Sequence, residues 1–307
     1  TSNGHVLQLG VDDDVIYEIP EGKERTTEKL RNEFIRICSE IRKKGGLPQV
    51  NHPFDVSFST RYNREFWDII EIFESIEIWN GATPFAAGTI NAKAFKKWLS
   101  LLDEGKRLTA TTGSDTHNIY GDDYFGMTEW LDWLMDTVMT HPEIYPIQMN
   151  EKVDYLTQLY KKVWPRLLAW VEQSNTPSTI HNYVYTNGKN NPQEILQAIR
   201  EGHSFISNGP LVTAEINGAS YGDTAVLKDK TGTLSVHVFS KKPISHLWMY
   251  TGADKKIELC AKADAAEGGF TYDIAADEFD FGDAAWALFV ADGGENNLAI
   301  SNPILFV

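Results

Sequence analysis

The segment Gly113-Ser114-Asp115-Thr116-His117 carries the strongest chemical signal in the chain. Residues i and i+2 of an extended segment point to the same side, so the Asp115 carboxylate and the His117 imidazole would stand side by side. Such a pair suits borderline divalent metals. Gly113 and Ser114 allow a tight backbone turn before it. The residues alone also leave open a hydrogen-bonded Asp–His pair that binds no metal.

Two more histidines stand at or beside the ends of expected strands. His52 follows a strand expected at 48–51, and Pro53 after it stops the strand and fixes the exit path of the chain. His5 opens a strand-like segment at 5–11, where a core histidine is the alternative. Sites in barrels and open α/β sheets gather at the carboxyl ends of strands. We therefore expect His5, His52, Asp115 and His117 to form one metal cluster.

The elements that must position these residues alternate between strand and helix. Strands are expected at 5–11, 48–51, 76–79 and 108–112, and the helices between them at 26–45, 66–73 and 91–102. The first helix begins at a capping sequence, Thr26-Thr27-Glu28, and ends at Gly45-Gly46. This alternation predicts an α/β layer or barrel.

Two regions depart from the alternation. Residues 124–173 are rich in Trp, Leu and Met and are expected to form a helical insertion, which either buries its own aromatics or forms a lid over a pocket. After residue 210, short β-rich runs separated by turn residues predict a small β-sandwich. We therefore expect two domains, residues 1–210 and residues 211–307.

The composition limits the classes of partner. The formal net charge of -15 repels nucleic-acid phosphates and anionic membranes, so neither is expected as a partner. Bound cations would still let a local site accept an anionic substrate. No segment approaches the ~20 apolar residues that span a bilayer, and no signal peptide or lipidation motif is visible. Cys38 and Cys260 are each expected to be a buried free thiol.

The motifs, taken in order, resemble those of the polymerase-and-histidinol-phosphatase (PHP) superfamily of metal-dependent hydrolases, and above all its CehA/McbA-like branch. The matching pieces are Gly4-His5-Val6-Leu7 with Gly10, Asn51-His52-Pro53-Phe54, Glu77-Ile78-Trp79-Asn80-Gly81, Gly113-Ser114-Asp115-Thr116-His117, Gly202-His203-Ser204-Phe205-Ile206-Ser207-Asn208-Gly209-Pro210 and Ser301-Asn302-Pro303-Ile304. They cover most of the chain apart from the insertion at 124–173.

This resemblance implies a distorted (β/α)7 barrel, its N-terminal part missing here, followed by the C-terminal β-sandwich. It implies two or three divalent ions, zinc, manganese or iron, with His5 and His52 on one ion, Asp115 on another and His117 on a third. A metal-activated water would attack a phosphoester or another small ester, so no side chain is assigned as the catalytic group.

The chain departs from the family at its start. The family's His-x-His pair, Asp-His pair and bridging glutamate have no counterpart among the 307 residues. The chain opens inside a strand-like segment, so we expect these ligands in a portion not included here. The chain by itself is then expected to bind metal poorly and to catalyse poorly.

Three further residues are expected to contact the substrate. Asn80 ends the strand at 76–79, His203 follows a helix expected at 192–201, and Arg61 lies where it could meet an anionic group. The structural alternatives are a turn residue, a polar cap of the preceding helix and a solvated loop residue, respectively. The competing hypothesis for the whole chain is a non-catalytic PHP-like scaffold whose sandwich binds a carbohydrate or a protein, which exposed aromatic platforms would favour.

Overall fold

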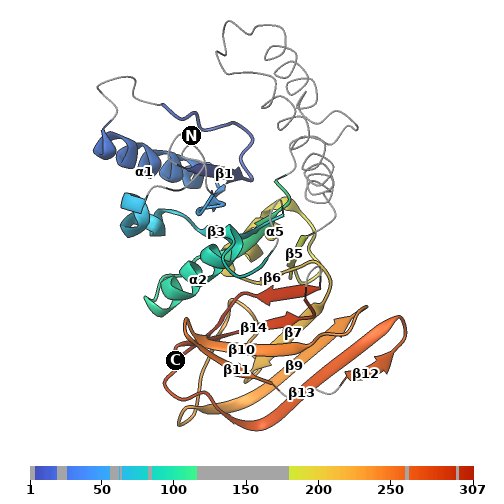
Figure 1. Ribbon diagram of the computed structural model, residues 1–307. Coiled ribbons are helices and arrows are strands. Elements are labelled where there is room, and N and C mark those ends of the chain that lie inside the picture. The colour runs from blue at the N-terminus through green and yellow to red at the C-terminus, as the bar shows by residue number, and fades with distance from the viewer. Residues whose placement is uncertain are drawn as a thin grey trace, which may run out of the picture. The chain divides into compact units, whose positions relative to one another are not determined.

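The computed structural model describes residues 4–18, 26–55, 62, 64–81, 85–115, 180–259, 263–294 and 297–307. These residues form a mixed α/β fold with four helices and three open sheets (Figure 1). The chain divides into two compact units, one made of Thr1–Gly113 with Ile180–Val307 and the other of Ser114–Thr179. The insertion predicted at 124–173 lies outside the described residues, and Ser114 and Asp115 are what is described of the second unit.

The first sheet holds the strands that carry the candidate site. In spatial order it contains β1 (His5–Leu9), β2 (Leu47–Asn51), β3 (Ser75–Asn80) and β4 (Thr109–Gly113). β2, β3 and β4 run parallel, whereas β1 pairs antiparallel with β2. The carboxyl ends of the three parallel strands therefore share one edge of the sheet, and the start of β1 lies beside the end of β2.

The described residues hold four helices, which pack with the strands. They are α1 (Thr27–Lys43), the 3-10 helix η2 (Arg64–Ile72), α2 (Ile90–Asp103) and α5 (Pro192–Glu201). α1 confirms the helix predicted after Thr26, whose side chain accepts the N–H of Lys29 at 3.3 Å. No helix within the described residues has the length and apolar character that crossing a bilayer requires.

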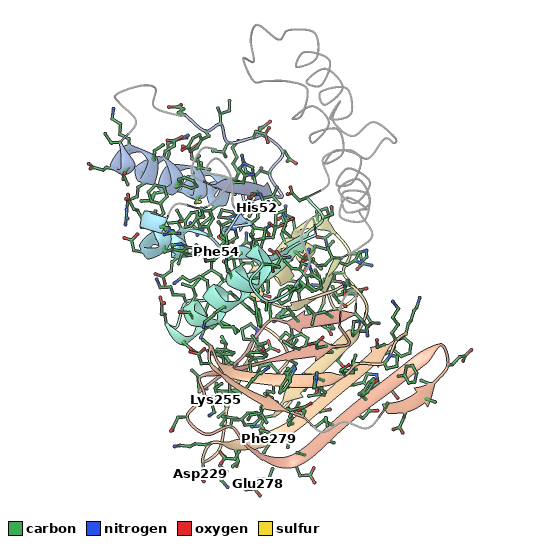
Figure 2. All side chains as sticks on the ribbon, in the orientation of Figure 1. His52, Phe54, Asp229, Lys255, Glu278 and Phe279 are labelled. Carbon is green, nitrogen blue, oxygen red and sulfur yellow. The ribbon has the colours of Figure 1, made fainter. Side chains whose placement is uncertain are left out.

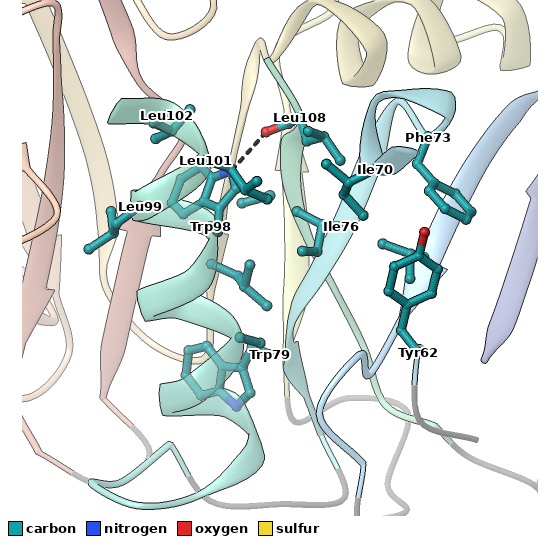
Figure 3. Close-up of a cluster of buried hydrophobic side chains, with 14 of the residues drawn as sticks. Tyr62, Ile70, Phe73, Ile76, Trp79, Trp98, Leu99, Leu101, Leu102 and Leu108 are labelled. Atoms are coloured by element: carbon teal, nitrogen blue, oxygen red, sulfur yellow. Dashed lines mark hydrogen bonds between the residues drawn. The ribbon is translucent and has the colours of Figure 1, made fainter. Parts of the chain in front are cut away.

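α2 is tied to β4 through a buried tryptophan. Trp98 is fully buried, and its ring Nε1 donates a hydrogen bond to the Leu108 carbonyl at 2.8 Å (Figure 3). The indole thus fills the core and still satisfies its single donor. Ile70, Ile76 and other apolar side chains around it build one contiguous cluster (Figure 3).

The strands of the other two sheets pair antiparallel, except for β8 and β16, which pair parallel. The eight-stranded sheet contains β5 (His181–Val184), β6 (Ser204–Ser207), β8 (Thr224–Ala225), β10 (His246–Gly252), β11 (Lys255–Glu258), β14 (Trp286–Asp292), β15 (Leu298–Ser301) and β16 (Ile304–Phe306). The third sheet contains β7 (Leu211–Ile216), β9 (Thr231–Ser240), β12 (Ala263–Ala266) and β13 (Gly269–Asp280). The eight-stranded sheet takes strands from both sides of residue 210, where the domain boundary is predicted.

β14 contributes to two hydrophobic cores. Trp286, Leu288 and Val290 belong to the cluster that includes Trp98. The intervening residues Ala287, Phe289 and Ala291 belong to the cluster with the third sheet. Because successive side chains of a strand point to opposite faces, the eight-stranded sheet has a core on each side.

Asparagine side chains complete the outer edge of β4. Asn302 accepts the Ala110 N–H at 2.7 Å and donates to the Ala110 carbonyl at 3.2 Å. Asn182 accepts the Thr112 N–H at 3.0 Å and donates to the Thr112 carbonyl at 2.7 Å. The two amides satisfy backbone groups that a neighbouring strand would otherwise pair.

The predicted (β/α)7 barrel is wrong. No sheet closes within the described residues. β1 is antiparallel, which leaves three parallel strands, and the outer edge of β4 receives asparagine amides instead of a further parallel strand. The strands after residue 180 pair in the other two sheets, so the strand–helix alternation that predicts a barrel stops at β4.

Candidate functional site

The structure brings His5 and His52 into contact. His5 pairs with Asn51 in the antiparallel register of β1 and β2, so it lies beside the residue that precedes His52. The distance from His5 Nδ1 to His52 Nε2 is 3.2 Å, and the ring planes meet at 76°. His52 is buried and His5 is half-buried. Two segments 47 positions apart in the chain thus present ring nitrogens to one another.

A buried glutamate holds the backbone of His52. The His52 N–H donates to Glu77 Oε2 at 2.6 Å, and Glu77 is 3% exposed on β3. Glu77 lies within one of the motifs that carry the family resemblance, but the sequence predicts no role for it. A carboxylate between Ile76 and Ile78, both fully buried, is the signal that could have found it, because a buried charge requires partners.

The second ring nitrogen of His52 faces a carboxylate at longer range. Within the described residues, His52 Nδ1 is buried and makes no hydrogen bond. Asp55 Oδ2 lies 3.8 Å from it, beyond hydrogen-bonding distance. Histidines that bind metals commonly donate their other ring N–H to such a carboxylate.

The distance between the two imidazoles suits shared coordination of a metal. Ring nitrogens that each lie ~2.05 Å from one tetrahedral zinc ion are about 3.3 Å apart, and the observed separation is 3.2 Å. A hydrogen bond between neutral imidazoles fits the same distance. The described residues contain no group of three or more His, Cys, Asp or Glu side chains that could hold an ion. His5 and His52 therefore fit as two ligands of a site that needs others.

The remaining two predicted ligands belong to the other compact unit. Asp115 comes two residues after the end of β4, is half-buried and has a φ of 54°. This left-handed conformation is uncommon for a residue other than glycine. His117 lies outside the described residues.

Of the predicted substrate contacts, Asn80 ends β3 and is 3% exposed. The Asn91 side chain accepts the Asn80 N–H at 2.8 Å and donates to the Asn80 carbonyl at 3.0 Å. Asn91 thereby fixes the backbone at the edge of the sheet where β2 and β4 also end. Arg61 lies outside the described residues.

His203 lies at the opposite end of the strands. It borders a cavity of about 520 Å³ that is also lined by Leu108 and Thr109 at the start of β4. Its Nε2 lies 3.1 Å from Asp223 Oδ1, and its Nδ1 lies 3.4 Å from Glu201 Oε2. Both ring nitrogens are therefore occupied by carboxylates, and the structure does not bring His203 to His5 and His52.

Comparison of the chain with protein-family models, with curated proteins and with solved structures finds no match. Function must therefore be inferred from the contact between the imidazoles and from the residues around it.

Proposed function

We propose that the chain acts as a metal-dependent hydrolase of the PHP type, with a phosphoester or another small ester as its substrate. The supporting observation is the 3.2 Å separation between His5 Nδ1 and His52 Nε2. A divalent ion bound between them would activate water and stabilise the negative charge that develops on the ester. The pair lies at the edge of the sheet where the parallel strands have their carboxyl ends, which agrees with where α/β sheets place their sites.

In this proposal each ligand has its own task. His5 and His52 hold one ion, and Asp115 and His117 contribute to a second and a third, as the resemblance implies. Imidazole and carboxylate ligands suit zinc, manganese and iron. Asn80 contacts the substrate at the same edge of the sheet, held in place by Asn91.

The test is metal binding and metal-dependent hydrolysis. Zinc and manganese are titrated calorimetrically into the metal-free chain and into His5→Ala and His52→Ala, and each substitution is expected to weaken binding more than about tenfold. Hydrolysis of aryl phosphates, phosphodiesters, carboxylic esters and carbamates is measured with and without chelator. The activity, expected to be weak, should disappear with the metal and in His117→Ala.

The matched control is His237→Ala, which removes an exposed imidazole that pairs with Asp273 at 2.7 Å on another sheet. It should bind zinc as the wild type does. Zinc affinity that is the same in all four proteins, or hydrolysis that survives complete chelation, would contradict the proposal.

The binding-module alternative finds no support in the described tryptophans. Trp79, Trp98 and Trp286 are buried. Trp67 and Trp248 are half-buried, with Lys97 Nζ 5.3 Å from the centre of the Trp67 ring and Lys256 Nζ 3.8 Å from that of Trp248. None of the tryptophans in the described ranges is an exposed platform for a sugar.

A further inference from the structure

His52 has an unusual backbone conformation. Its φ is 24°, in the region that favours glycine, and Pro53 after it restricts it further. Such a conformation persists only when the surrounding structure holds it. Figure 2 shows His52 in the part of the molecule built from α1 and β1 to β4.

The group that holds it is the carboxylate of Glu77. The His52 N–H donates to Glu77 Oε2 at 2.6 Å, which is shorter than an ordinary N–H···O hydrogen bond. Glu77 comes from the centre of β3, where it pairs with Thr111 of β4, the two residues before it pair with β2, and its side chain is buried. The acceptor is therefore rigid, and it fixes the point at which the chain leaves β2.

Gly113 at the end of β4 leaves room for this carboxylate. A β-carbon on Gly113 would lie 3.0 Å from Glu77 Oε1, closer than an ordinary contact. Gly113 does not have a positive φ, so space and not backbone conformation accounts for glycine here. The carboxylate of Glu77 thus lies beside the ends of both β2 and β4.

We propose that Glu77 is the positioning residue of the His5–His52 pair: it fixes the backbone of His52 and thereby aims the His52 ring at His5. This inference rests on the proposed metal-binding function, but its geometry belongs to the metal-free chain. Glu77 acts on a ligand through the protein backbone, so its removal should change how well the two ring nitrogens are presented to an ion.

The first measurement needs no metal. Hydrogen exchange of the His52 amide is followed by NMR in the wild type, Glu77→Gln and Glu77→Ala. The amide is expected to exchange slowly in the wild type and in Glu77→Gln, which keeps an oxygen acceptor, and at least about tenfold faster in Glu77→Ala. The control, Glu74→Ala, removes a carboxylate that binds Arg42 and Arg200 close to β3. It should leave the His52 amide protected.

The second measurement uses zinc, with cobalt as a spectroscopic probe of histidine ligation. Glu77→Ala is expected to weaken zinc binding by about 10- to 100-fold and to alter the cobalt spectrum. Glu77→Gln should restore both, and Glu74→Ala should match the wild type. Gly113→Ala, which crowds the carboxylate without removing it, should weaken binding in the same direction.

The outcomes separate this inference from the proposed function. If the wild type binds no zinc, the proposed function fails, and the amide measurement still decides the role of Glu77. If the wild type binds zinc and a folded Glu77→Ala binds it equally well, with an equally protected His52 amide, Glu77 does not position the pair. If Glu77→Ala does not fold, Glu77→Gln and Gly113→Ala carry both measurements.

Discussion

Cys38 lies on the buried face of α1 and has no exposed surface. Burial penalises the thiolate and raises the pKa of the thiol to about 12. At pH 8 only about one such thiol in ten thousand is ionised, and the thiolate is the reactive form. Cys38 thus behaves as a small apolar side chain.

This predicts that Cys38 is inert in the folded chain. In a Cys260→Ser variant, dithionitrobenzoate at pH 8 should label Cys38 only as fast as the protein unfolds, and should label it at once in denaturant. Because the folded-state pKa lies above the usual value of 9.0, stability from this group is complete below pH 9 and falls as the pH rises toward 12. Labelling of the native protein within seconds would contradict the burial.

The candidate site was only partly predictable from single residues. His5 and His52 could be named because histidines at strand ends are a local signal, and the structure places their rings in contact. Their role as metal ligands stays a prediction. Glu77 was missed because its importance comes from a bond to the backbone of a residue 25 positions earlier. No pattern of residue types records such a bond.

Along the outer edge of β4, side chains and not a further strand make the hydrogen bonds to the backbone. Asn302 is 1% exposed, and besides its two bonds to Ala110 it donates to the Ser204 carbonyl at 3.0 Å. It therefore links the first sheet to β6 in the eight-stranded sheet. Asn182 makes the equivalent pair of bonds to Thr112, two residues further along the strand.

Replacement of Asn302 by alanine is therefore expected to destabilise the fold by about 2–4 kcal/mol, because buried backbone groups lose their partners. Asn190→Ala is the control, since Asn190 is exposed and its side chain contacts the Thr186 hydroxyl. It should change stability by less than about 0.5 kcal/mol. Urea unfolding measures the free energy of unfolding of both variants. If Asn302→Ala lost no more stability than Asn190→Ala, the hydrogen bonds of Asn302 would contribute little to the fold.

The individual elements were easier to predict than their arrangement. The apolar stripe and the cap at Thr26 predicted α1 because both signals are local. The antiparallel pairing of β1 and the asparagine amides along the outer edge of β4 could not be predicted from local signals. Asn302 and Ala110 are 192 positions apart. An amide that takes the place of a neighbouring strand produces no periodic pattern in the sequence. The barrel was expected because strand–helix alternation by itself does not say where a parallel sheet stops.

The eight-stranded sheet contributes side chains to two hydrophobic cores, one on each of its faces. Leu288 packs with the first sheet and α2, and its neighbour Phe289 packs with the third sheet. On β6, Ile206 likewise belongs to the first of these cores and Phe205 to the second. Loss of either core would expose one face of a shared layer, so the two cores should depend on one another.

We therefore expect the two cores to unfold in one transition. Leu288→Ala and Phe289→Ala each create a cavity and should cost roughly 2–5 kcal/mol, and each should lower hydrogen-exchange protection in both β3 and β9 by the same free energy. Glu215→Ala, an exposed position on β7, is the control and should change neither strand. If Phe289→Ala lowered protection in β9 and left β3 unchanged, the two cores would unfold independently. A domain boundary near residue 210, as the sequence predicts, would then describe the energetics better than the shared sheet does.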